Sequence, residues 1–75
     1  MNKQRRKEIQ KNIQLLEEAK NNLENILSDE QDYFDNMPEN LQGSIRGEDS
    51  EEAIDVLQEA IDAIDECMSS LNDII

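Results

Sequence analysis

Apolar residues recur through the C-terminal third of the chain at alternating spacings of three and four. This set comprises Ile54, Leu57, Ile61, Ile64, Met68, Leu71 and Ile75. Such spacing places side chains along one side of an α-helix, as in a heptad repeat. The pattern therefore predicts a last helix over about residues 50–75, and we call these seven residues its seam.

A second seam with the same spacing runs through the N-terminal half of the chain. It comprises Ile9, Ile13, Leu16, Leu23 and Leu27, with Lys20 standing where an apolar residue is expected. Ala19 and Ile26 flank this seam and widen it. Because the residues have good helix propensity and no Gly or Pro occurs before Pro38, we predict a first helix over about residues 2–35.

The connection, over about residues 36–49, contains the first helix breaker. Pro38 disfavours helical geometry at the residue before it and suits the start of a short helix, which we place at 38–42. Ser50 is the cleaner N-cap for the last helix, because acidic residues follow it in the first turn. Ser44 offers an earlier start, in which Gly47 would sit inside the first turns at a cost of about 1 kcal/mol. Both starts remain open.

Two long helices joined by this connection predict one all-α domain over residues 1–75, folded as an antiparallel hairpin. Matching the two seams pairs Leu27 with Ile54 and Ile9 with Leu71. In that register Lys20 lies near Asp62 or Asp65. The basic start of the first helix, Arg5 to Lys7, then lies beside Asp73. In this interpretation the basic charges complement the acidic end of the last helix.

The last helix has more apolar positions than one neighbouring helix can cover. Val56 and Ala63 are expected on one flank of its seam, and Ala53, Ala60, Cys67 and Ile74 on the other. A strip that wide indicates two neighbours. We therefore predict self-association through these six residues, most simply as a homodimer that forms a four-helix bundle.

Charge is the strongest compositional feature, with a formal net charge of −12 and no basic residue after Arg46. Carboxylates recur at helical spacing on the outer face of the last helix, at Asp55, Glu59, Asp62, Asp65, Glu66 and Asp73. Neighbours three or four apart stand about 5–6 Å from each other, which is similar in scale to successive phosphates of one nucleic-acid strand. The helix could thus imitate nucleic acid in a basic channel, or its acidic residues could form an ordinary solvated face.

The same charge argues against binding to nucleic acid or to an anionic membrane. A third hypothesis has the basic segment Lys3 to Lys11 touch nucleic acid directly, but no aromatic residues are interleaved with its charges.

Catalytic chemistry has little to build on, because the chain lacks His and a glycine-rich phosphate loop and its Ser residues have no neighbouring base. We predict no enzyme activity, no cofactor and no metal site. There is no apolar run long enough to span a membrane. A lone Cys67 fits a small core residue in a reducing cytoplasm.

Four apolar residues near the connection, Tyr33, Phe34, Met37 and Leu41, allow two interpretations. They either close the end of the hairpin or form an exposed anchor for a partner, since loops on rigid scaffolds carry function.

The run Phe34-Asp-Asn-Met-Pro-Glu-Asn-Leu-Gln42, followed by Arg46-Gly-Glu48, resembles a group of short acidic proteins encoded by bacteriophages and integrated mobile elements of Gram-positive bacteria. The resemblance covers roughly residues 29–66 and implies an origin more than an activity. Small, acidic, non-enzymatic phage proteins often inhibit host defence nucleases or polymerases, so a phage origin favours a protein of the host cytoplasm that inhibits or modulates such an enzyme. The alternative function is that of a self-associating structural bundle.

Overall fold

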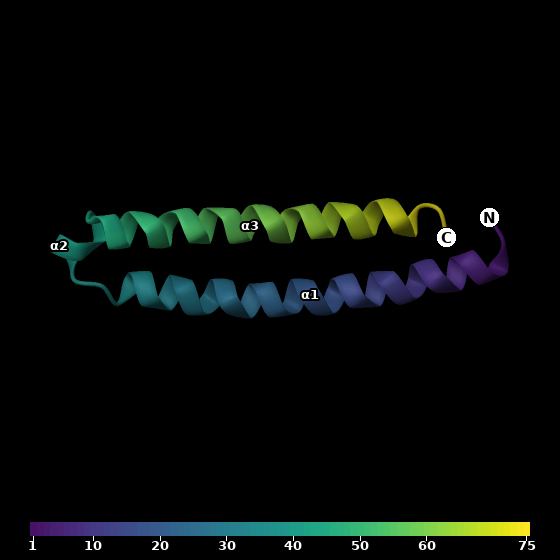
Figure 1. The fold of residues 1–75 in the computed structure, drawn as a ribbon, viewed down its shortest axis with the longest axis horizontal. Helices are drawn as coiled ribbons and strands as arrows, with labels where there is room; N and C mark the ends of the chain where they lie inside the picture. The colour runs from purple at the N-terminus through teal and green to yellow at the C-terminus, as the bar shows by residue number, and fades with distance from the viewer.

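The structure, a computed structural model, describes all residues from Met1 to Ile75 and is built of helices alone. Its elements are α1 (Lys3–Asp35), α2 (Glu39–Gln42) and α3 (Ile45–Asn72). Figure 1 shows α1 and α3 side by side in opposite directions, with α2 at one end and both termini at the other. The predicted all-α class is confirmed.

Side-chain and backbone caps explain where α1 begins and ends. At its start the Asn2 Oδ1 accepts a hydrogen bond from the Arg5 N–H at 2.8 Å. At its end the Asn36 N–H donates to the Asp32 carbonyl at 3.0 Å, and Pro38 follows soon after. Gln42 reaches back from α2, and its Nε2 donates to the Phe34 and Met37 carbonyls at 3.3 Å each. Such bonds satisfy carbonyls that a helix end would otherwise leave unpaired.

The start of α3 corrects the prediction that it begins near residue 50. Ser44 is the N-cap, because its hydroxyl accepts a hydrogen bond from the Gly47 N–H at 3.4 Å and donates to the Leu41 carbonyl. Ser50 is buried, with 3% of its surface exposed, and its hydroxyl donates to the Glu30 Oε1 at 2.8 Å. It is therefore a contact between helices rather than a cap. α3 also ends at Asn72, short of residue 75.

At Gly47 the backbone of α2 lies so close to α3 that no side chain fits between them. A Cβ atom placed at Gly47 would lie 2.1 Å from the Gln42 carbonyl oxygen and 2.7 Å from the Gln42 Cα. Since these are backbone atoms, they cannot move aside as the end of a flexible side chain does. The glycine that costs helix propensity in the sequence is therefore what allows the chain to turn back here.

The first testable prediction concerns Gly47→Ala. The added methyl group forces α2 away from α3, and we expect the free energy of unfolding to fall by about 1–3 kcal/mol despite the better helix propensity of Ala. Thermal and urea unfolding followed by circular dichroism measure the change.

Gly43→Ala is the matched control, because nothing lies within 4 Å of a Cβ at Gly43 and its φ is −86°. Its free energy of unfolding is expected to change by less than about 0.5 kcal/mol. Equal stability of the two variants would contradict the close approach at Gly47.

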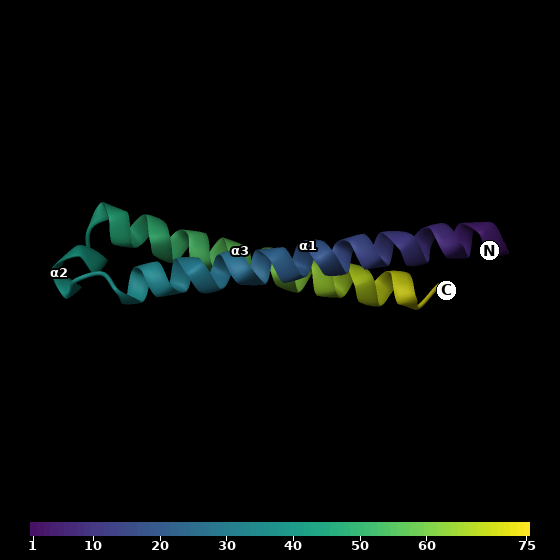
Figure 2. The same cartoon turned by 90° about the horizontal axis from the view of Figure 1, so that it is seen from below.

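The core of the hairpin is thin. Only 5 of 75 residues are buried, the apolar ones being Met37, Ile61 and Met68, and no large side chain is less than 2% exposed. The molecule measures 58 × 15 × 13 Å with a radius of gyration of 17.1 Å, against about 11 Å for a compact domain of this length. Figure 2 shows the two long helices crossing at a small angle. A single line of helix contact therefore supplies almost all of the burial.

Two contacts between side chains of α1 and α3 agree with the predicted register of the seams. The first joins Ser50 to Glu30 at one end of the hairpin. The second joins the Lys20 Nζ to the Asp65 Oδ1 at 2.7 Å near the middle. Of the two carboxylates expected near Lys20, it is Asp65 that pairs, while Asp62 accepts a hydrogen bond from Gln58 at 3.1 Å.

The prediction that Arg5 to Lys7 complement Asp73 is wrong. The ion pairs within the chain all involve Lys20, so the basic first turns of α1 have no carboxylate partner within 4 Å. Figure 1 shows the reason: the start of α1 extends beyond the end of α3, where no helix lies beside it. These charges remain free for solvent or for another molecule.

Candidate interaction surfaces

Three strips of side chains run along different sides of α3, because their positions are offset from one another within the helical repeat. The seam faces α1. The acidic strip comprises Asp55, Glu59, Asp62, Asp65, Glu66 and Asp73. The small-residue strip comprises Ala53, Val56, Ala60, Ala63, Cys67 and Ile74.

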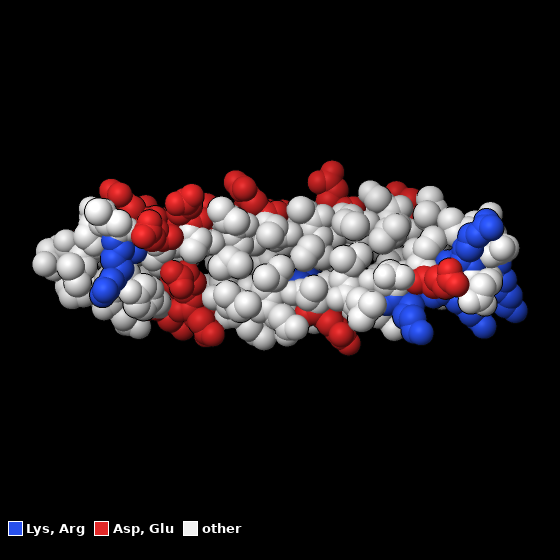
Figure 3. Space-filling view, viewed as in Figure 1, with Lys and Arg blue, Asp and Glu red and all other residues white.

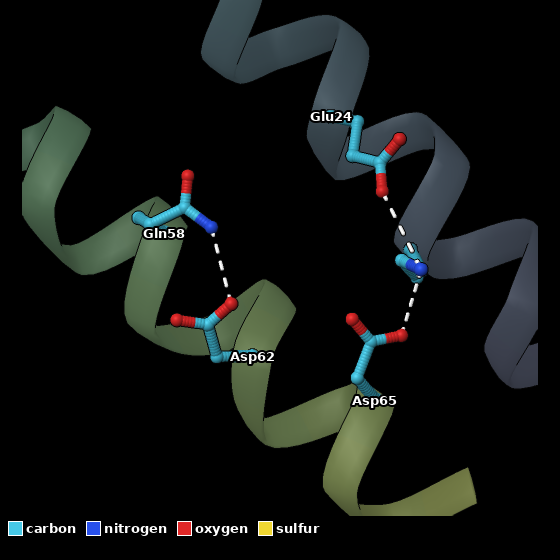
Figure 4. Close-up of polar contacts among 5 residues, drawn as sticks. Glu24, Gln58, Asp62 and Asp65 are labelled. Atoms are coloured by element: carbon cyan, nitrogen blue, oxygen red, sulfur yellow. Dashed lines mark hydrogen bonds and ion pairs between the residues drawn. The ribbon is translucent and has the colours of Figure 1, made fainter.

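The acidic strip is exposed along its whole length, and the chain neutralises little of it. Figure 4 shows Asp65 turned toward α1, where it meets Lys20, and Asp62 held by Gln58 on its own helix. The other carboxylates of the strip have no cation within 4 Å. α3 therefore presents a straight row of carboxylates, most of them without an ion-pair partner.

Lys20 forms the one ion pair that joins α1 to α3, through Asp65. Its side chain is 20% exposed, and its Nζ lies 2.7 Å from Asp65 and 3.7 Å from Glu24. The hydrogen bond to Asp65 raises the pKa of Lys20 above its ordinary 10.5, partial desolvation opposes the shift, and the nearby carboxylates add to it. The ammonium therefore stays charged at neutral pH while its stem lies across the seam.

A second testable prediction follows from this position in the seam. Lys20→Leu places an apolar side chain between Leu16 and Leu23, and we expect the melting temperature to rise, because an exposed ion pair contributes little and a packed leucine contributes more. Thermal unfolding followed by circular dichroism measures it, and Lys11→Leu, at an exposed position, is the control that should leave the melting temperature unchanged.

The pH dependence of the melting temperature is a second measurement of the role of Lys20. Because the folded-state pKa of Lys20 is raised, the stability contributed by the ion pair is present below pH 10.5 and is lost as the pH rises through the raised pKa. Lys20→Leu should lack this loss. A lower melting temperature in the variant at neutral pH would show that the ion pair outweighs seam packing.

The small-residue strip corrects the prediction that its members flank the seam on two sides. Ala53, Val56, Ala60 and Ala63 follow one another at spacings of three and four, so they lie on a single side of α3. Ala53 and Ala60 are half-buried against α1, and the other four residues are exposed, Val56 at 55%. Cys67 is exposed as well, so the expectation of a core cysteine is wrong for the hairpin by itself.

α1 carries a matching strip that the sequence reasoning recognised only in part. Leu15, Ala19 and Ile26 each stand one residue before a seam position, as do the residues of the small-residue strip, and Tyr33 lies one heptad after Ile26. In an antiparallel pair, positions that precede the seams of the two helices lie on the same face. The signal was in the spacing, but only the opposed directions of the helices bring the two strips together.

We call the combined surface of these two strips the apolar face. Leu15 is 57% exposed and Ile26 is 51% exposed. Figure 3 shows this side of the hairpin nearly free of charge along its middle, with Asp and Glu on both long edges. Lys and Arg gather mainly at the end where the termini lie.

The four residues of the candidate loop anchor divide between the two interpretations. Met37 is buried and Phe34 is half-buried, so both help to close the end of the hairpin. Tyr33 and Leu41 are exposed, Tyr33 at 46%, and Tyr33 lies at the end of the apolar face.

The run from Phe34 to Gln42 with Gly47, on which the phage resemblance rests, builds this turn. Comparison with family models, curated proteins and solved structures gave no match.

No pocket opens on the surface, and no cluster of three or more His, Cys, Asp or Glu side chains could hold a metal ion. None of the helices combines the length and hydropathy needed to cross a bilayer.

Proposed function

We propose that the chain is a non-enzymatic protein that binds a basic surface of another macromolecule through the acidic strip of α3. The carrying observation is that six exposed carboxylates share one side of the helix and Lys20 neutralises only Asp65. Keeping these like charges together is unfavourable for the isolated chain, and a cationic partner relieves the repulsion. The helix fixes the backbone positions of these side chains, so the backbone needs no ordering on binding.

The partner chemistry that fits best is a channel made for nucleic acid. Carboxylates three or four residues apart on the strip repeat at about 5–6 Å, and a channel lined by Lys and Arg for phosphates also attracts carboxylates. With the resemblance of the turn to phage and mobile-element proteins, this supports an inhibitor of a host defence or nucleic-acid enzyme as the biological role.

A self-associating structural bundle is the second candidate, and the exposed apolar face favours it. The two functions can coexist, because the acidic and small-residue strips occupy different sides of α3. Their separation also lets each be tested by substitutions that leave the other unchanged.

The third testable prediction compares two variants with the same net charge. The test variant is Asp55→Asn, Glu59→Gln, Asp62→Asn and Glu66→Gln. The control is Glu17→Gln, Glu18→Gln, Asp32→Asn and Glu39→Gln, at exposed positions of α1 and α2. Each chain is immobilised and used to capture proteins from a bacterial lysate at low salt, and the captured protein is then purified and its affinity for both variants measured.

We expect the test variant to lose roughly fourfold to several hundredfold in affinity, since four exposed charge contacts contribute about 0.2–1 kcal/mol each, and the control to bind like wild type. Binding should weaken with salt and be displaced by excess duplex DNA. Equal binding of the two variants, or binding insensitive to salt, contradicts the acidic strip as the contact. Salt-sensitive binding that DNA does not displace contradicts nucleic-acid mimicry.

A further inference from the structure

We propose that the apolar face is the contact surface for a second copy of this chain, with the two copies packed face to face and reversed end to end. The result is a two-fold symmetric four-helix bundle in which α1 packs on α1 and α3 packs on α3, each pair antiparallel. This inference does not depend on the proposed binding of a basic partner.

Burial is the first argument for this contact. The hairpin alone has no large side chain that is fully buried, while Leu15, Ile26 and Val56 are each more than half exposed on one face. The broad side of the whole molecule measures 58 by 15 Å, or roughly 900 Å², against about 800 Å² for each partner of a standard interface, and the apolar face takes up only part of it. A second copy that covers the apolar face supplies the layer of the core that the hairpin lacks.

The distribution of charge along the molecule selects the reversed orientation. The segment from Lys3 to Lys11 carries five basic residues and one acidic residue, and it lies at the end with the termini. The opposite end, from Asp29 to Glu52, carries nine acidic residues and one basic residue. Reversed copies place each basic end against an acidic end, whereas copies with the same orientation place like ends together. The free charges of Arg5 to Lys7 find their partners in this way.

The position of the two-fold axis follows from the small-residue strip. Reversal of α3 about Ala60 places Val56 near Ala63 of the second copy and Ala53 near Cys67. Only small side chains then meet along the centre of the contact, apart from Val56, which permits a close approach of the two helices.

The residues of α1 place the two-fold axis at the same position along the hairpin. Reversal about the midpoint between Ala19 and Asn22 places Leu15 near Ile26 of the second copy and Ala19 near Asn22. This midpoint lies beside Ala60 in the register set by the Ser50–Glu30 contact. Both helices thus fit one axis, with Leu15 and Ile26 of α1 on either side of it and Ala19 and Ala60 beside it.

The fourth testable prediction concerns the oligomeric state of the full chain. Sedimentation velocity at micromolar concentration should give a dimer. Ala63→Glu places a carboxylate inside the contact and should weaken the dimer by more than about tenfold, because a charge buried without a partner is costly. Ala63 is exposed in the hairpin, so circular dichroism at matched dimer fraction should show retained helicity.

Gln58→Glu is the matched control, because it adds the same charge at an exposed position on the other side of α3 and should leave the dimer intact. A wild-type chain that sediments as a monomer with full helicity overturns the proposal, as does equal weakening by the two substitutions. The neutralised acidic-strip variant should still dimerise, and loss of its dimer would also overturn the apolar face as the contact. Failure of dimerisation and failure of basic-partner binding are therefore read from different variants.

The fifth testable prediction fixes the orientation by oxidative cross-linking. In the reversed arrangement Cys67 lies opposite Ala53 of the second copy, so wild type should not form a disulfide-linked dimer. Ala60→Cys in a Cys67→Ser background places the two thiols at the axis, within the roughly 4–7 Å between Cα atoms that a disulfide needs, and should cross-link.

A mixture of that variant with Ala19→Cys in the Cys67→Ser background tests the same-end arrangement, in which α1 packs on α3 of the second copy. A disulfide between positions 19 and 60, without one between two copies of position 60, overturns the reversed orientation.

Discussion

The close approach of α2 to α3 at Gly47 determines how the two long helices face one another. Because the Gln42 backbone occupies the space of a side chain, α3 can begin immediately after the turn, with Ser44 as its cap. This start brings Ser50 to the inner side of α3, where it meets Glu30. The register of the whole hairpin, and with it the position of every exposed strip, depends on this short contact.

The exposed strips matter because the hairpin buries so little. Two helices share one line of contact, and a core of three buried apolar residues leaves much of the apolar surface in water. A chain of this length that formed a compact bundle of short helices would cover more of it. The long hairpin instead leaves one face that is nearly uncharged along its middle exposed to water.

Charge and apolar surface are kept apart around α3 rather than mixed. The acidic strip and the small-residue strip each follow a seven-residue repeat that is offset from the seam, so neither interrupts the other. One cation, Lys20, enters the seam, and its pair with Asp65 lies on the polar side of the hairpin. The chain can therefore present carboxylates to one partner while it packs against another, because the two contacts use different sides of one rigid helix.

The sequence by itself determined the helical class, the long helices and the pairing of seams, because heptad spacing, helix propensity and the break at Pro38 are local properties. It also determined which residues are acidic and which are small. It did not determine which serine caps α3. The acidic residues that follow Ser50 favour Ser50 locally, and only the packing of Gly47 on α2 and of Ser50 on Glu30 makes Ser44 the cap. Nor could spacing along one helix show that Leu15 and Ile26 of α1 share a face with Val56 and Ala63 of α3. That common face exists only because the helices run in opposite directions, which is a property of the tertiary structure.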